Sequence, residues 1–281
     1  MIIRQEQDRL FSDNRQLIWI PEVQERPGDR QRKAETDQSG QTRGITREIG
    51  NMANGKVRKG LFGLFGKKKE EPEKNVSEGG DEVPGWDAIE AEFLRIYPGQ
   101  TSPKHYAAIL PWMLGGKDPL DGISIYDGGD YWHFVSFGQT ELYRKESEDP
   151  QISGYGYELT FKLRKQDPET DEPEIRNVCG ILQSIARLTF TKGEIFRPFE
   201  FIHTGQTTGI DAFQKSALTG FITVPDPLLR TIRTPYGEVS FLELIGMTDA
   251  ELRSLSDHAS VEAIYGRLGS DVTDYVRASL I

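Results

Sequence analysis

Apolar residues are unevenly distributed along the chain, and helical or strand periodicity begins only near residue 84. Four apolar residues then follow the i, i+4, i+7, i+8 spacing of one helix face: Ile89, Phe93, Ile96 and Tyr97. Pro98 and Gly99 end this predicted helix. A second helix is predicted over residues 103–114, with Pro103 tolerated in its first turn and Gly115 at its end. The folded part of the chain is therefore expected to open with two helices.

Alternating apolar and polar positions predict a β-hairpin and then a long strand. The hairpin joins residues 123–126 to residues 132–137 through the turn Asp127-Gly128-Gly129. In GYGYELTFKLR, residues 154–164, five apolar side chains alternate with small or polar ones: Tyr155, Tyr157, Leu159, Phe161 and Leu163. One face of this strand is expected to belong to the core, and the other is expected to be polar.

The rest of the chain alternates helices and strands irregularly. Five apolar residues predict a helix after an acidic stretch: Val178, Ile181, Leu182, Ile185 and Leu188. Strand-like stretches follow near residues 196–203, 217–224 and 238–245. Thr248 and Glu251 fit a capping box that opens a short helix, and residues 261–268 predict another. This order predicts an α+β fold, with a mixed, largely antiparallel sheet and packed helices.

Composition divides the chain close to residue 84. Residues 1–83 contain 16 Lys/Arg, 15 Asp/Glu and 22 apolar residues, too few apolar groups to offset the entropy lost on ordering. Residues 84–281 contain 18 Lys/Arg and 29 Asp/Glu, a net charge of −11. We therefore expect residues 1–83 to be a disordered or linker-like extension and residues 84–281 to form one domain.

Two features of the extension leave alternatives open. The motif LIWI, Leu17–Ile20, fits a strand, a partner-binding anchor or a stretch without a role. Translation starting at Met52 is an alternative to translation from Met1, because MANGKVRKGLFG has the character of the start of a small bacterial protein. Residues 1–51 would then be upstream sequence included by a misplaced start. The intact mass of the native protein would show which of the two starts is used.

Cysteine content, hydropathy and charge indicate a cytoplasmic protein with a protein partner. Cys179 is the only cysteine, so a disulfide-stapled fold is excluded. No apolar run approaches the roughly 18 residues that a membrane span needs. A net charge of −11 repels phosphate backbones and attracts basic proteins. We therefore expect no nucleic-acid binding, no membrane span, and a basic partner.

Sequence patterns of catalysis and of metal or phosphate binding are absent. There is no G-x-S-x-G elbow and no glycine-rich phosphate loop with the required spacing. The four histidines are far apart, without H-x-x-x-H or C-x-x-C pairs. We therefore expect a protein that is not an enzyme and binds no cofactor or metal. His133, in an aromatic strand, is expected to be a hydrogen-bonded structural residue, and Cys179 a packed one.

Several charged residues are candidates for partner contacts. Asp118 and Asp121 in DPLDG are explained by turn formation, with a metal or acid pair as the alternative. Glu158 and Lys162 share the polar face of the long strand, and are interpreted either as a surface ion pair or as a charged partner-binding face. The acidic stretch Asp167–Glu174 is either a solvated loop or a docking site for a basic partner.

Four long blocks resemble the suppressor-of-fused family. They are LGGKDPLDGISIYDGGDYWHFVSFGQTELY, SGYGYELTFKLR, LQSIARLTF and DPLLRTIRTPYGEVSFLELIGMTDAEL. The opening PGWDAI and the closing TDYVRAS extend the resemblance over almost all of residues 84–281. It implies the fold of the family's N-terminal lobe.

The resemblance also indicates which family properties to expect. The animal member represses Hedgehog signalling by gripping an extended peptide of zinc-finger transcription factors between two lobes. Here the chain ends where the second lobe would begin, so this two-sided clamp is not expected within one chain. A ligand-contacting tyrosine of the family corresponds to Leu188, and Glu200 lies in the region of its acidic partner residue. Glu200 is therefore a further candidate contact, and Hedgehog-type binding is not expected.

Single-lobe bacterial relatives are associated with immunity proteins that neutralise polymorphic toxins. The resemblance thus implies a non-catalytic protein-binding domain, and the leading hypothesis is a cytosolic immunity protein that binds a basic toxin domain. The alternative is an intracellular adaptor or regulator that binds an extended peptide by strand addition.

Overall fold

The structure, a computed structural model, describes residues 83–110 and 112–281. The extension predicted for residues 1–83, with the LIWI motif and the alternative start at Met52, lies outside the described residues apart from Val83.

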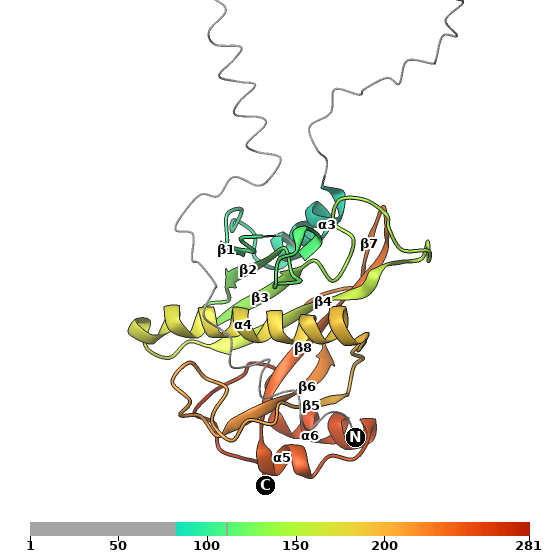
Figure 1. Cartoon of the computed structure of the whole chain (residues 1–281). Helices are drawn as coiled ribbons and strands as arrows, with labels where there is room; N and C mark the ends of the chain where they lie inside the picture. The colour runs from blue at the N-terminus through green and yellow to red at the C-terminus, as the bar shows by residue number, and fades with distance from the viewer. Residues whose placement is uncertain (1–82, 111) are drawn as a thin grey trace, which may run out of the picture. The chain divides into compact units, whose positions relative to one another are not determined.

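The described chain folds around one mixed sheet (Figure 1). Its strands are β1 (Lys104–Ala107), β2 (Gly122–Asp127), β3 (Tyr131–Phe137), β4 (Ile152–Arg164), β5 (Phe201–His203), β6 (Leu218–Pro225), β7 (Ile232–Thr234) and β8 (Gly237–Thr248). The order is β1-β2-β3-β4-β8-β6-β5, with β7 also paired to β8. Only the β4–β8 pair is parallel. The helices are α3 (Pro84–Ile96), α4 (Pro168–Lys192), α5 (Asp249–Arg253) and α6 (His258–Leu268). The predicted α+β class with a largely antiparallel sheet is confirmed.

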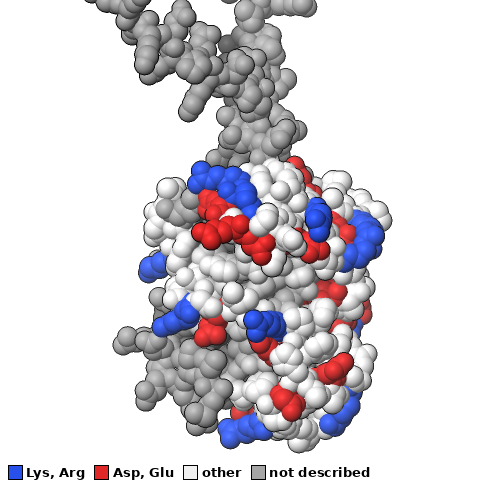
Figure 2. Space-filling view, turned by 90° about the vertical axis from the view of Figure 1, so that its right-hand side faces the viewer, with Lys and Arg blue, Asp and Glu red and all other residues white. Residues whose placement is uncertain are grey.

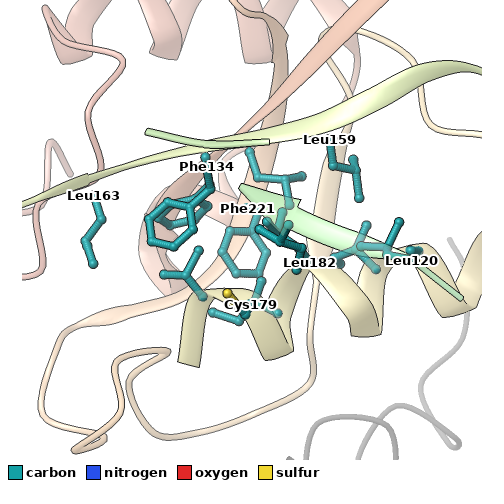
Figure 3. Close-up of a cluster of buried hydrophobic side chains, with 14 of the residues drawn as sticks. Leu120, Phe134, Leu159, Leu163, Cys179, Leu182 and Phe221 are labelled. Carbon is teal, nitrogen blue, oxygen red and sulfur yellow. The ribbon is translucent and has the colours of Figure 1, made fainter. Parts of the chain in front are cut away.

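Helix α4 runs across one face of the sheet and closes the main core (Figure 1). Cys179 and Leu182 on this helix face the buried aromatic rings of Phe134 and Phe221 (Figure 3). Cys179 is fully buried, as expected of a packed residue. Burial also raises the pKa of its thiol, which keeps it protonated and unreactive.

The other face of the sheet carries two separate apolar clusters. One lies under α3 and includes Phe93, which stacks on Tyr126 with ring centroids 4.8 Å apart. The other lies under α5 and α6 and includes Met247 and Leu252. α5 begins with the predicted capping box, in which Thr248 accepts from the N–H of Glu251. A strip of polar residues separates the two clusters.

The predicted helix over residues 103–114 is wrong. Residues Lys104–Ala107 form strand β1, and only Trp112–Leu114 form a short 3-10 turn. Tyr106 in β1 is buried against the α4 side of the sheet, and β1 pairs with β2 in antiparallel register. Pairing with β2 therefore overrides the weak local preference for a helix, which Pro111 already limits.

The acidic stretch predicted as a loop is instead the start of α4. Asp167 caps the helix by accepting from the N–H of Glu169, and Pro168 occupies the first turn. Glu169 and Asp171 lie in that turn, where negative charge is favourable at the positive end of the helix dipole. These acids stabilise the helix N-terminus, and a docking role for them stays a prediction.

The C-terminal segment, residues 270–281, is held between β4 and β8. Thr273 forms a parallel bridge with Leu163, and its hydroxyl accepts from the N–H of Gly246 at 3.0 Å. Arg277 donates to both carboxylate oxygens of Glu251, which is fully buried in α5. The segment therefore belongs to the fold.

Replacing Arg277 with Met is expected to lower the free energy of unfolding by about 3 kcal/mol at pH 7, because Glu251 would lose its countercharge. Despite burial, the bonds from Arg277 lower the pKa of Glu251 to about 2. The stabilisation is therefore complete above about pH 4.5 and is lost as the pH falls toward 2, so the deficit of the variant should shrink on acidification.

Urea unfolding at pH 7 and pH 3 measures this difference. The control is Arg253→Met, which removes an exposed pair with Asp249 and should cost under about 1 kcal/mol. An equal loss in both variants would contradict the role assigned to Arg277.

Candidate protein-binding surface

The polar face of β4 is buried, so the expectation that Glu158 and Lys162 lie on the surface is wrong. Glu158, Thr160 and Lys162 each have no exposed area. With His133, Asp226 and Glu243 they lie on the face opposite α4, between the two apolar clusters. In this structure neither Glu158 nor Lys162 can contact a partner.

Lys162 lies in a cage of three carboxylates. Its Nζ is 3.0 Å from Asp226, 2.8 Å from Glu243 and 2.8 Å from Asp271. Burial alone would lower the pKa of Lys162, but these carboxylates raise it above its usual value. Burial raises the pKa of Glu243 well above the usual range despite Lys162. The cage therefore surrounds one ammonium group with three acidic side chains, of which Glu243 favours its protonated form.

His133 extends this network toward α3. Its Nε2 is 2.9 Å from Asp226, and its Nδ1 is 2.8 Å from the hydroxyl of Tyr97. Burial lowers the pKa of His133, although Asp226 opposes this effect. His133 is thus a neutral, hydrogen-bonded structural residue, as predicted.

Glu158 organises the turn after β3. Its carboxylate accepts from the hydroxyls of Ser136 at 2.5 Å and Thr140 at 2.6 Å, and from the N–H groups of Gly138 at 3.1 Å and Thr140 at 2.9 Å. Burial raises the pKa of Glu158 to about 7, against the lowering effect of these bonds. This carboxylate therefore stabilises the loop Gly138–Thr140.

Asp118 lies in irregular backbone and Asp121 at a bend before β2, and their predicted role in turn formation stays a prediction. Asp118 forms an ion pair with Arg187 of α4 at 3.1 Å, and the N–H of Asp121 donates to the carbonyl of Phe137. Burial raises the pKa of Asp121. No group of three acidic, His or Cys residues suited to a metal ion occurs within residues 83–281 as described. A partner contact by either aspartate stays a prediction.

Burial of acidic residues weakens the charge argument for a basic partner. Seven carboxylate residues and one cation of the domain are buried: Glu92, Glu158, Glu174, Asp211, Asp226, Glu243, Glu251 and Lys162. Of 29 acidic and 18 basic residues, 22 and 17 then remain at the surface, a balance of −5 rather than −11. Figure 2 shows acidic and basic side chains interspersed on one face. Steering of a basic partner is correspondingly weaker.

Strand β5 forms one end of the sheet and presents a strand edge. Among the described residues it pairs only with β6. The N–H of Thr223 in β6 donates to the carbonyl of Glu200, and Ile202 pairs with Phe221. Because main-chain groups alternate in direction along an antiparallel strand, those of Phe201 point away from β6. This geometry is suited to the addition of an extended segment.

The backbone beside this edge is strained. Phe199 has a φ of 63°, a left-handed conformation that is rare for a bulky residue and occurs often at functional sites. Glu200 follows it, half-buried, and its carboxylate accepts from the N–H of Arg197 at 3.0 Å. Leu188 is buried in α4 and contributes to the main core. Glu200 is thus the one sequence-predicted candidate at the β5 edge, where its role as a contact stays a prediction.

The sequence gives no signal for the importance of Phe199 or Phe201. Both pack against the cluster under α5 and α6, and the rings of Phe201 and His203 meet edge-on, 5.6 Å apart. FEFIH has only the weak alternation of a short strand. The left-handed turn depends on pairing with β6, which local sequence does not specify.

No helix in the described part of the chain combines the length and apolar character required to cross a membrane.

Comparisons with known proteins agree with the fold. The sequence model of the family described as "Suppressor of fused protein (SUFU)" matches residues 116–278. The Suppressor of fused homologs of Mus musculus and Homo sapiens are each 32% identical over 185 residues, which covers 60% of this chain and 37% of theirs. Thus the match spans well under half of each curated relative.

Two solved structures are also similar. Drosophila Suppressor of Fused is 30% identical with a TM-score of 0.59, over 70% of this chain and 51% of that one. A chain of a Sufu–Fu complex gives the same identity and TM-score, over 70% of this chain and 92% of that chain.

Proposed function

Because the chain belongs to the suppressor-of-fused family, we propose that residues 84–281 form a non-catalytic domain that binds another protein. The similar Sufu–Fu complex supports this proposal, since that structure contains a relative bound to a protein partner. The proposed setting is the cytoplasm. The domain needs no cofactor for this role.

The observation that carries the proposal is the edge of β5 beside the strained Phe199. An extended segment that pairs with Phe201 would gain main-chain hydrogen bonds, and adjacent side chains such as Glu200 would add selectivity. We therefore propose strand addition at this edge, which is the mode expected of an adaptor or regulator.

Toxin neutralisation is the more specific function that we propose for this binding. The remaining surface balance of −5 supports a basic toxin domain as the partner, although less strongly than the sequence charge alone. The test combines a pull-down of the protein encoded by the adjacent gene with rescue of growth when that protein is expressed. Complex formation with rescue supports immunity, and complex formation alone supports the adaptor. If neither a complex nor rescue is observed, the immunity hypothesis is excluded.

Replacing Phe201 with Pro is expected to weaken partner binding at least about tenfold, because proline removes a main-chain donor at the edge. The matched control is Phe201→Ala, which loses the same ring but keeps the N–H group. Isothermal titration with the captured partner compares the two variants, after circular dichroism has shown that both are folded. Equal affinities for the two variants would exclude strand addition at Phe201.

A further inference from the structure

Residues 270–274, which we call the inserted segment, lie where the pairing of β4 with β8 ends. The N–H of Thr273 donates to the carbonyl of Lys162 at 2.8 Å, and the N–H of Arg164 donates to the carbonyl of Thr273 at 2.9 Å. On the β8 side, the hydroxyl of Thr273 accepts from the N–H of Gly246. The inserted segment thus bonds to both strands without belonging to either.

The inserted segment also carries the most exposed acid of the Lys162 cage. The side chains of Lys162, Asp226 and Glu243 are at most 1% exposed, whereas Asp271 is 23% exposed. Asp226 directly follows β6 and Glu243 lies within β8, but Asp271 lies outside the named helices and strands. Asp271 is therefore the cage residue that can move into water without disrupting a strand.

Hydrogen bonds within the cage indicate where a proton is held. Asp226 accepts four hydrogen bonds, two at each oxygen, from Lys162, the N–H of Leu228, His133 and Thr160. Four donors favour an ionised carboxylate. Oε1 of Glu243, by contrast, is buried and has no hydrogen-bond partner within the described part of the chain. A buried oxygen without a donor favours the protonated carboxyl group.

Glu243 and Asp271 compete for one ammonium group. Lys162 Nζ lies 2.8 Å from an oxygen of each. With Asp226 also ionised, three carboxylates around one cation would leave negative charge uncompensated in a buried site, which is unfavourable. A proton on Glu243 relieves this excess while Asp271 stays in the cage. Without that proton, the excess is relieved when Asp271 moves into water.

We propose that the inserted segment is bound between β4 and β8 while Glu243 is protonated, and is released, with Asp271 leaving Lys162, when Glu243 ionises. This conformational switch is independent of the β5 edge and does not require the proposed function.

The other titratable groups around Glu243 do not ionise in the same pH range. Tyr97 follows α3 and Tyr265 lies on α6, and burial raises the pKa of both hydroxyls. His133 faces the cage through Asp226, and burial lowers its pKa, so it stays neutral above about pH 6.5. Glu243 is therefore the group whose ionisation controls the switch at neutral and alkaline pH.

Protonation of Glu243 and binding of the inserted segment stabilise each other. Burial raises the pKa of Glu243, and the charges of Asp226 and Asp271 add to this effect against the opposing charge of Lys162. Release of Asp271 removes one of these negative charges, so the pKa of Glu243 is lower in the released state. Binding of the segment therefore weakens as the pH rises through these two pKa values. A difference of one pKa unit changes the equilibrium about tenfold.

Hydrogen exchange of main-chain amides between pH 6 and pH 9 tests the switch in the full chain. The reporters are the N–H groups of Thr273 and Arg164, whose bonds join the inserted segment to β4. The reference is the N–H of Ala108, which donates to the carbonyl of Asp121. Protection factors correct for the intrinsic pH dependence of exchange. We expect the protection of both reporters, relative to Ala108, to fall at least about tenfold as the pH rises.

Three variants decide between the possible outcomes. Glu243→Gln cannot ionise and should keep both reporters protected over the whole range. Asp271→Asn changes a partly exposed residue, should not disturb the fold, and should remove the pH dependence. Asp274→Asn is the matched control, because Asp274 lies in the same segment but accepts from Gln166. It should retain the pH dependence of the unmodified chain.

PH-independent protection in the unmodified chain would overturn the inference. An equal pH dependence in Asp271→Asn and Asp274→Asn would overturn it as well. The NMR signal of the Glu243 carboxyl carbon, identified by its loss in Glu243→Gln, gives a second measurement. Its titration should coincide with the loss of protection, and titration in a different pH range would exclude Glu243 as the controlling group.

Discussion

Replacing Lys162 with Met is expected to lower the free energy of unfolding by about 4 kcal/mol at pH 7, because three acidic side chains would face one another without a cation. Lys162 and Asp226 are almost completely shielded from water, so solvent cannot replace the lost charge. Without Lys162 the lowered pKa of Asp226 should rise, and the deficit should become smaller as the pH falls.

Arg164→Met is the matched control for Lys162→Met. Arg164 lies two residues further along the same strand and pairs with Asp130, but both side chains are partly exposed, so its removal should cost under about 1 kcal/mol. Urea unfolding of both variants at pH 7 and pH 5 measures the difference. If Lys162→Met is no less stable than Arg164→Met, the carboxylate cage does not stabilise the domain.

Replacing Glu158 with Ala is expected to cost about 3–5 kcal/mol, because the hydrogen-bond donors of Ser136, Gly138 and Thr140 would be buried without an acceptor. Glu158→Gln keeps the shape of the side chain but presents an amide to these donors, and should show an intermediate loss. Thermal and urea unfolding at pH 7 rank the two variants.

The pH dependence of stability distinguishes Glu158 from Glu141, a second carboxylate in the same region. The pKa of Glu158 is raised to about 7, so the folded state retains a proton that the unfolded chain loses above about pH 4.5. Stability contributed by this group therefore falls as the pH rises from 4.5 to 7, by at most about 3 kcal/mol. Glu158→Gln should lack this slope.

Glu141 is expected to give the opposite pH dependence of stability. Despite burial, bonds from Lys145 and from main-chain N–H groups lower its pKa to about 2. Its stabilising effect is therefore complete above about pH 4.5 and is lost as the pH falls toward 2. Glu141→Gln should flatten only the acidic part of the stability curve.

An unchanged slope between pH 4.5 and 7 in Glu158→Gln would contradict the buried, proton-retaining state of that residue.

Sequence periodicity predicted the elements that depend on local pattern. Helix α3, the β2–β3 hairpin and β4 follow from the spacing of side chains such as Phe93 and Phe161. Strand β1 was predicted as a helix, because only its pairing with β2 distinguishes the two structures. Local pattern does not contain that long-range information.

The candidate site was less predictable than the fold. Alternation in β4 correctly separates two faces, but a polar face buried under other elements has the same pattern as a solvated one. The carboxylates that surround Lys162 come from Asp226, Glu243 and Asp271, far along the chain, and no local motif links them. Glu200 was a candidate contact through family resemblance alone, whereas the strained turn at Phe199 has no sequence signal.

The parallel pairing of β4 with β8 has a consequence for synthesis of the protein. Leu159 pairs with Leu242, so residues 159 and 242, which are 83 positions apart, must both be available. At about 5–20 residues per second, a ribosome needs roughly 4–17 s to synthesise this interval. During that time one edge of β4 lacks its partner strand, which makes the nascent chain prone to incorrect strand pairing. The nascent chain should therefore depend on chaperones most strongly before β8 has left the ribosome.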